Sequence, residues 1–172
     1  FRVKQKFLFF PIIQKDQDFR LLLENALPVS KILEDTYHLE GRQVLLFVGR
    51  LIDIKNLFFL LDALALVVNR YPKVILLFVG DGDQRVALER HAERNGLADH
   101  VIFAGKKQGE DLYACYNVGQ IFILPSYYER FGAVVNEALL AGCYTLCSVV
   151  AGAACLIEPQ KNGDLFDPAS KT

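Results

Sequence analysis

Two glutamates that stand eight residues apart, Glu129 and Glu137, are the side chains of this sequence best placed to do chemistry. Between them, a glycine opens a segment that predicts a helix over residues 132–142. The first N–H groups of a helix lack partners within it, and with the helix dipole they form an anion site. A carboxylate beside such a site can accept hydrogen bonds from the hydroxyl groups of a ligand. The N–H groups concerned belong to Gly132, Ala133 and Val134.

A short apolar strand is expected just before this motif. Residues 120–124 are apolar after the first, as in a buried parallel strand, and Pro125 ends the run. Loops that leave the carboxyl ends of parallel strands line the ligand crevice of a doubly wound sheet. Glu129 is therefore expected in a crevice loop. Glu137 is expected about one helical turn deeper, where a ribose would lie if the anion were a nucleoside diphosphate.

Two cations, Arg50 and Lys55, follow another predicted strand over residues 44–48 and should face the same crevice. The planar guanidinium of Arg50 can bind two phosphate oxygens at once, and Lys55 adds a compact charge. Together the two cations predict a diphosphate site. The alternative is that both pair with surface acids, as exposed cations often do.

Apolar runs alternate with helical patterns along most of the chain, which predicts an α/β fold with a parallel sheet and right-handed crossovers. Residues 16–38 also have a helical pattern, which Pro28 should divide, and residues 6–10 predict a short strand or an extended entry segment. The glycine-rich segment 80–82 favours a tight turn over a nucleotide loop, because it lacks the spacing of a dinucleotide fingerprint. Strands are expected over 44–48, 74–79, 101–103, 120–124, 144–148 and 165–166, and helices over 56–70, 84–95, 109–116 and 132–142.

Composition is that of a well-buried globular domain. Hydrophobic residues make up 52% of the chain and the net charge is −1, with no cluster of lysine and arginine that would predict a nucleic-acid partner. No apolar run is long enough to span a bilayer. We expect all four cysteines to be reduced and structural, which indicates a cytoplasmic compartment. Phe1 is neither an initiator methionine nor the start of a signal peptide, so we expect a piece of a longer protein.

The residues around the two glutamates add a resemblance to these predictions. The segment resembles the Glu-x7-Glu motif of retaining GT-B glycosyltransferases, specifically of glycosyltransferase family 4, and the resemblance extends over residues 43–168. It implies a Rossmann-like parallel sheet with helices on both faces, the C-terminal half of a GT-B fold, after a helical or linker segment over residues 1–42. The N-terminal acceptor domain would be absent from this chain. The matching pairs are Pro125-Ser126, Phe131-Gly132, Glu137-Ala138 and Ala141-Gly142.

The resemblance also implies a role for each site residue. Glu129 would bind hydroxyl groups of the donor sugar, Arg50 and Lys55 would contact the diphosphate, and Glu137 would bind the ribose. Glu129, Arg50 and Lys55 are thus the expected catalytic residues. Because the two cations and the helix N-terminus meet the charge of the leaving group, no metal and no cofactor are expected. The other expected donor-binding residues are Gly49, Phe131, Gly132, Ala133 and Val134, with Gly105 and Lys106 beside the nucleobase.

Several positions depart from the family pattern. Asn56 replaces a glycine and is expected to cap the next helix. Tyr144 replaces a proline, Ala151-Gly152 stands for a pair of glycines, and Cys155 takes the place of an acid. The last three departures concern a second loop on the sugar side of the site rather than the fold.

The activity implied by the resemblance is transfer of a sugar from a nucleoside diphosphate sugar to a carbohydrate or lipid-linked acceptor, with retention of configuration. Such a hexosyltransferase would serve the synthesis of cell-surface polysaccharide in the cytoplasm, and the missing domain would make any contact with the inner face of the membrane. Without that domain, the chain should bind donor weakly and catalyse little or no transfer. The alternatives are a GT-B sugar-nucleotide epimerase, which the residues around the glutamates disfavour, and a non-catalytic nucleotide-binding domain.

Overall fold

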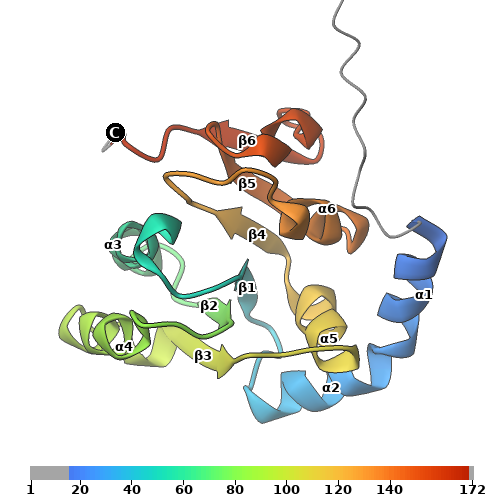
Figure 1. The fold of residues 1–172 in the computed structure, drawn as a ribbon. Helices are drawn as coiled ribbons and strands as arrows, with labels where there is room; N and C mark the ends of the chain where they lie inside the picture. The colour runs from blue at the N-terminus through green and yellow to red at the C-terminus, as the bar shows by residue number, and fades with distance from the viewer. Residues whose placement is uncertain (1–15, 171–172) are drawn as a thin grey trace, which may run out of the picture.

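The computed structural model describes residues 16–170, and within them it contains one six-stranded parallel sheet (Figure 1). The strand order is β3-β2-β1-β4-β5-β6, so the direction of winding reverses between β1 and β4. In sheets of this order the ligand crevice lies at that reversal, outside the carboxyl ends of the strands. The strands are β1 Gln43–Val48, β2 Val74–Val79, β3 Val101–Gly105, β4 Ile121–Leu124, β5 Tyr144–Ser148 and β6 Gly163–Phe166.

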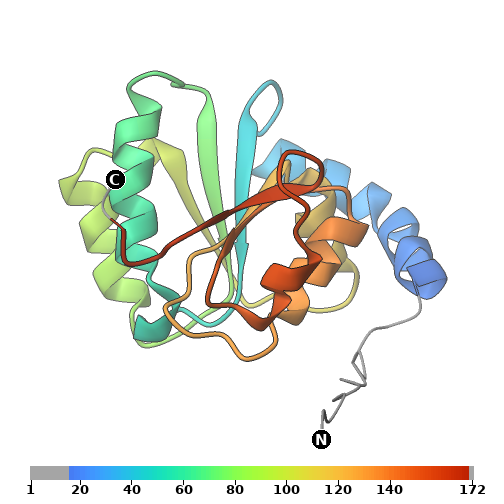
Figure 2. The same cartoon turned by 90° about the horizontal axis from the view of Figure 1, so that it is seen from above.

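Helices cover both faces of the sheet (Figure 2). One face packs against α3 Leu57–Val68 and α4 Arg85–Arg94. The other packs against α5 Glu110–Val118 and α6 Ala133–Leu140. This layered arrangement confirms the predicted α/β class, and the six strands predicted between residues 44 and 166 are all present. Short 3₁₀ turns lie at Asp53–Lys55, Ala98–His100 and Gly152–Leu156.

Two further helices, α1 Asp16–Asn25 and α2 Leu27–Thr36, pack on the outer side of α5. The helical pattern is interrupted as predicted, with Pro28 in the first turn of α2. Phe19 of α1 is buried, and its ring meets the ring of Tyr113 edge-on, with 5.4 Å between centroids. The strand predicted over residues 6–10 lies outside the described residues.

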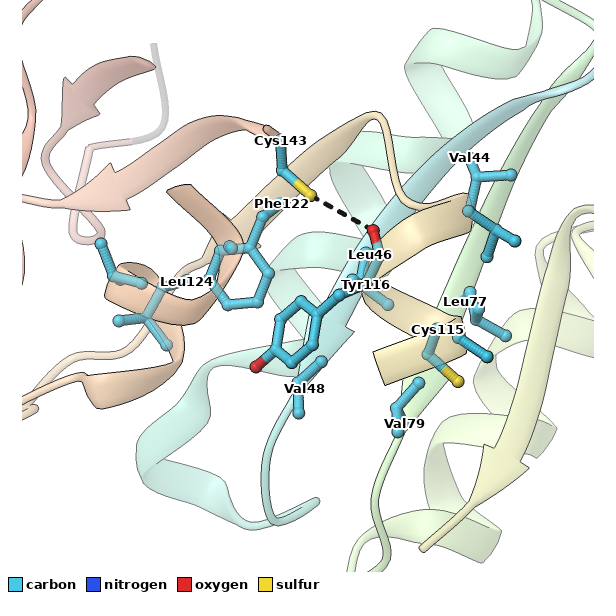
Figure 3. Packing of buried hydrophobic residues seen from close by; sticks show 14 of the residues in the cluster. Val44, Leu46, Val48, Leu77, Val79, Cys115, Tyr116, Phe122, Leu124 and Cys143 are labelled. Atoms are coloured by element: carbon cyan, nitrogen blue, oxygen red, sulfur yellow. Dashed lines mark hydrogen bonds between the residues drawn. The ribbon is translucent and has the colours of Figure 1, made fainter. Parts of the chain in front are cut away.

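Strand β2 is apolar on both faces because elements of the fold pack against both sides of it. Every residue of β2 is buried, and Phe78 of this strand stacks on Phe103 of β3 with 5.0 Å between centroids. On the other side of the sheet, a buried cluster joins β1 and β4 to α5 (Figure 3). The central strands therefore form a rigid base for the loops at their carboxyl ends.

The face that carries α3 is covered only in part. Beyond α3, an apolar groove of about 750 Å³ runs along β1, β4, β5 and β6. None of the sequence-predicted site residues lines it. The lining side chains include Leu45, Phe59, Val67, Ile121, Leu146 and Phe166.

Candidate functional site

The carboxyl ends of β1, β2 and β3 meet through their backbones. The amide of Gly49 donates to the carbonyl of Val79 at 2.9 Å, and the amide of Gly80 donates to the carbonyl of Gly105 at 2.9 Å. A Cβ atom on Gly80 would lie 1.8 Å from the carbonyl oxygen of Gly49, so only glycine permits this approach. The segment 80–82 is the tight turn that the sequence predicted, and it brings Gly49 and Gly105 to neighbouring positions. Lys106 follows Gly105 and is exposed.

The loop after β4 and the loop after β1 are joined by an ion pair. The Lys55 ammonium group contacts the Glu129 carboxylate, although the two residues are 74 positions apart. Their side chains are 14% and 19% exposed, so water reaches the pair only in part. The backbone reinforces the contact, because the amide of Tyr127 donates to the carbonyl of Ile54 at 2.9 Å. The structure thus brings together two of the three predicted catalytic residues.

The third, Arg50, lies on the same loop as Lys55 and is exposed. Within residues 16–170 its guanidinium makes no ion pair, so its five N–H donors remain available to a ligand. The alternative that both cations pair with surface acids therefore fails for Arg50. Lys55 pairs instead with a residue of the predicted site.

Asn56 does not cap helix α3 with its side chain, which corrects the sequence-based expectation. Its backbone is left-handed, with φ at 57°, and no capping hydrogen bond is formed. Asparagine tolerates this conformation better than most residues, which is how it can stand where the family has glycine. The side chain is buried instead, and its amide donates to the carbonyl of Pro168 at 3.3 Å. Asn56 thereby ties the end of the described chain to the loop that carries Lys55.

Helix α6 begins beside Glu129, as the motif predicted. Gly132 precedes the helix with φ at 77°, a left-handed conformation that favours glycine. A Cβ atom on Gly132 would lie 3.4 Å from Cγ of Glu129, so the helix N-terminus and this carboxylate are neighbours. Within the described chain, the amides of Gly132, Ala133 and Val134 donate to no protein acceptor. Phe131, just before them, is 73% exposed.

Glu137 lies on α6, about one turn from its start, and is partly buried. Its carboxylate accepts a hydrogen bond from the hydroxyl group of Tyr116 on α5, with 2.7 Å between the oxygens. Tyr116 is fully buried. Burial and, next, the charge of Glu137 raise the pKa of this phenol well above 10. Tyr116 is therefore a neutral donor to Glu137 at physiological pH.

The second sugar-side loop depends on a glycine that the family pattern and this chain share. The amide of Gly152 donates to the carbonyl of Glu129 at 2.8 Å, and Glu129 and Ala151 form a parallel bridge. A Cβ atom on Gly152 would lie 2.0 Å from the carbonyl oxygen of Arg130. Gly152 therefore allows this loop to support the backbone of Glu129.

Tyr144 and Cys155 are the other two positions that depart from the family pattern in this part of the sequence. Tyr144 is the first residue of β5, at the edge of the sheet opposite the crevice, where its hydroxyl group donates to Asp164. Cys155 lies in the turn Gly152–Leu156 and is exposed, so the structural role expected for it is wrong. The other three cysteines are buried, and all four are free thiols.

Tyr116 was not predicted from the sequence as part of the site. Tyr116 ends the helix expected over residues 109–116, and no local pattern connects it with Glu137, which is 21 residues away. Buried tyrosine hydroxyl groups usually require a partner, and this rule is the one signal that would have prompted a search for a nearby carboxylate.

The described residues contain no group of three or more histidine, cysteine, aspartate and glutamate side chains placed to hold a metal ion. Among the helices of residues 16–170, none combines the length and the apolar character needed to cross a bilayer.

Residues 30–172 match the family described as group 1 glycosyl transferases. The chain belongs to this family. One relative, an uncharacterized glycosyltransferase of Methanocaldococcus jannaschii, is 33% identical over 124 residues, which make up 72% of this chain and 32% of that protein. The alpha-D-kanosaminyltransferase of Streptomyces kanamyceticus is 29% identical over 136 residues, or 79% of this chain and 35% of that protein. The chain thus spans about a third of the length of these relatives.

Solved structures share the fold. Anabaena Alr3699/HepE, solved in complex with UDP, has a TM-score of 0.73 at 28% identity, over 82% of this chain and 39% of that one. The C-terminal domain of the group 1 glycosyl transferase LpcC from Francisella tularensis has a TM-score of 0.70 at 23% identity, over 76% of this chain and 70% of that one. The fold is therefore that of the Rossmann-like C-terminal domain of a GT-B glycosyltransferase, as the resemblance implied.

Proposed function

We propose that this chain is the donor-binding domain of a family 4 hexosyltransferase that moves a sugar from a nucleoside diphosphate sugar to an acceptor hydroxyl with retention of configuration. The observation that carries the proposal is the meeting of Lys55, Glu129 and the Gly132 helix terminus where the strand order reverses. The UDP complex of HepE, which has the same fold, supports a nucleoside diphosphate as the ligand. Membership of a transferase family favours transfer over epimerisation or simple nucleotide binding.

In this proposal the diphosphate lies between the cations and the helix terminus. Lys55 has three N–H donors, so it can keep its contact with Glu129 and still donate to a phosphate oxygen. Arg50 adds a paired set of donors, and the amides at the start of α6 add neutral ones. These groups are fixed before the ligand arrives, so they stabilise the charge that develops on the leaving diphosphate at little reorganisation cost, and no metal is needed.

The two glutamates bind the sugar and the ribose of the donor. Glu129 binds sugar hydroxyl groups beside the diphosphate, and Glu137 binds the ribose one turn along α6. The backbone at Gly105 and Lys106 lies beside the base. The acceptor, a carbohydrate or a lipid-linked sugar, is bound by a second domain in a cytoplasmic enzyme of cell-surface polysaccharide synthesis. The proposal assigns no general base to this chain.

The test is calorimetric titration of the chain with UDP, GDP and ADP, with and without magnesium. We expect one diphosphate to bind independently of magnesium. The double variant Arg50→Ala/Lys55→Ala should weaken this binding about 100-fold, the scale of losing two charge-assisted contacts.

A matched control removes one arginine and one lysine that lie away from the crevice, toward the amino ends of the strands. Arg94 and Lys73 are both exposed, and Arg94→Ala/Lys73→Ala should leave the affinity unchanged. A failure of all three diphosphates to bind, or equal losses in the two double variants, would overturn the donor-site proposal. A requirement for magnesium would overturn its metal-free form.

A further inference from the structure

Glu137 differs from Glu129, the other glutamate of the motif, because no cation neutralises it. Within residues 16–170, it forms no ion pair, and the one hydrogen bond to its carboxylate comes from Tyr116. That bond uses the oxygen Oε2 and leaves Oε1 without a donor from the described chain. A carboxylate has room for about four hydrogen bonds, so most of its accepting capacity is unused. Oε1 of this partly buried carboxylate is thus open to hydrogen-bond donors from a ligand.

Tyr116 is held at both ends. Its phenol ring is fully buried between aromatic neighbours, with its centroid 6.4 Å from the ring of Phe19 and 6.4 Å from the ring of Phe122. The thiol of Cys143, which is also buried, lies 3.7 Å from the backbone carbonyl of Tyr116 (Figure 3) and closer to the carbonyl of Gly119, at 3.1 Å. The hydroxyl group therefore has a fixed position, and the oxygen of Glu137 that it contacts is fixed with it.

We propose that Tyr116 is a positioning residue for donor binding: its buried hydroxyl group holds one oxygen of Glu137 so that the other faces the ribose hydroxyl groups of the nucleotide. This inference rests on the proposed function and names a residue that acts through Glu137 without touching the ligand. A neutral phenol suits the role, because it orients the carboxylate without compensating its charge. A lysine in its place would compete with the ribose for the same oxygens.

The test compares the affinities of two ligands rather than the stabilities of two variants. The diphosphate that binds most tightly among UDP, GDP and ADP is titrated beside its 2′,3′-dideoxy form, which lacks the ribose hydroxyl groups. We expect the unsubstituted chain to prefer the ribonucleotide by about tenfold, the scale of a hydrogen bond to a charged group. Tyr116→Phe keeps the ring and removes only the hydroxyl group. It should reduce this preference to about twofold and leave binding of the dideoxy ligand unchanged.

Tyr144→Phe is the matched control, because it also removes one hydrogen bond between a tyrosine and a carboxylate, but at the opposite edge of the sheet. It should leave the preference intact. A second variant, Glu137→Gln, should lose the preference by itself, and adding Tyr116→Phe to it should cause no further loss.

The possible failures are distinct. Equal weakening of both ligands in Tyr116→Phe would mean a structural role for Tyr116 and would overturn the inference, as would a preference that survives the substitution. An unsubstituted chain that binds both ligands equally would overturn the ribose role of Glu137, and with it this inference. Failure of all three diphosphates to bind would overturn the proposed function itself.

Discussion

The two glutamates of the motif lie in opposite electrostatic environments, although one loop and one helical turn separate them. Glu129 is on a loop and is paired with the cation of Lys55. Glu137 is on helix α6, is paired with no cation within residues 16–170, and accepts a hydrogen bond from a neutral, buried phenol. The difference indicates that Glu129 belongs to a charge-balanced cluster, whereas Glu137 keeps its charge for a ligand.

The supports of the two glutamates also differ. The backbone of Glu129 is fixed from outside its own element, by the loop that contains Gly152 and by the ion pair with Lys55. Glu137 is fixed by a regular helix packed on the core and by Tyr116. A substitution in a neighbouring loop should therefore displace Glu129 far more than Glu137, because loops depend on contacts that a helix does not need.

The largest effect is expected from Gly152→Ala. The added Cβ atom would lie 2.0 Å from the carbonyl oxygen of Arg130, and backbone cannot move aside as a side chain can. The two loops must separate, at a cost of about 3 kcal/mol in the free energy of unfolding. Nucleotide affinity should fall as well, because Glu129 moves. Urea denaturation and calorimetry measure the two losses.

Gly142→Ala is the matched control for that substitution. Gly142 has φ at 85° but no atom near its added Cβ, so the change should cost only about 1 kcal/mol of backbone strain. It should leave nucleotide affinity unchanged. If the two alanine variants were equally stable, the support that Gly152 gives to Glu129 would be refuted.

A smaller effect is expected from Lys55→Met, which removes the charge and keeps the apolar stem. Glu129 would then be an uncompensated charge that is 19% exposed, and the free energy of unfolding should fall by about 1–2 kcal/mol. Adding Glu129→Gln should restore part of this loss, since the uncompensated charge disappears. Chemical denaturation of the two single variants and the double variant gives the coupling energy.

Lys161→Met supplies the comparison for an exposed pair. Lys161 contacts Glu158 at 2.7 Å, but the side chains are 76% and 65% exposed. Such pairs contribute little, so we expect no measurable change in stability. Equal losses in Lys55→Met and Lys161→Met would contradict the idea that the Lys55–Glu129 pair is special to the site.

The sequence predicted the sheet and the place of the motif because both depend on local patterns. Short apolar runs such as residues 74–79 can only be buried strands in this alternation, and Gly132 marks a helix start by its own conformational freedom. The pair of Lys55 with Glu129 and the bond of Tyr116 to Glu137 join residues far apart in the chain. No local pattern contains such contacts, so roles could be predicted for these residues but their partners could not.

At Asn56 and Cys155 a local pattern did give a prediction, and tertiary contacts overruled it. Asparagine before a helix predicts a capping side chain, yet the tertiary contact with Pro168 determines where the Asn56 side chain lies. A cysteine in a globular chain is most often buried, but Cys155 lies on an exposed turn. In both cases the local preference is weaker than the contacts that the fold imposes.

The most gradual effect is expected from the three buried thiols, Cys115, Cys143 and Cys147. Burial raises the pKa of Cys115 to about 12 and the pKa values of Cys143 and Cys147 to about 11, from 9.0 for a free thiol. For Cys147, the charge of Glu129 adds to the effect of burial.

Since the unfolded chain loses these protons first, their contribution to stability is complete below about pH 8 and declines as the pH rises toward 11. Chemical denaturation at intervals from pH 7 to pH 10 should show this decline. Cys147→Ala should make it less steep, whereas Cys155→Ser, at an exposed thiol, should not change it.

Glu129→Gln should reduce only the share of this decline in stability that Cys147 contributes. The charge of Glu129 raises the pKa of Cys147 and of neither thiol next to Tyr116. An identical pH dependence in the chain and in Cys147→Ala would contradict the burial of this thiol, and an effect of Glu129→Gln beyond the share of Cys147 would mean that the two carboxylate environments are less separate than their contacts indicate.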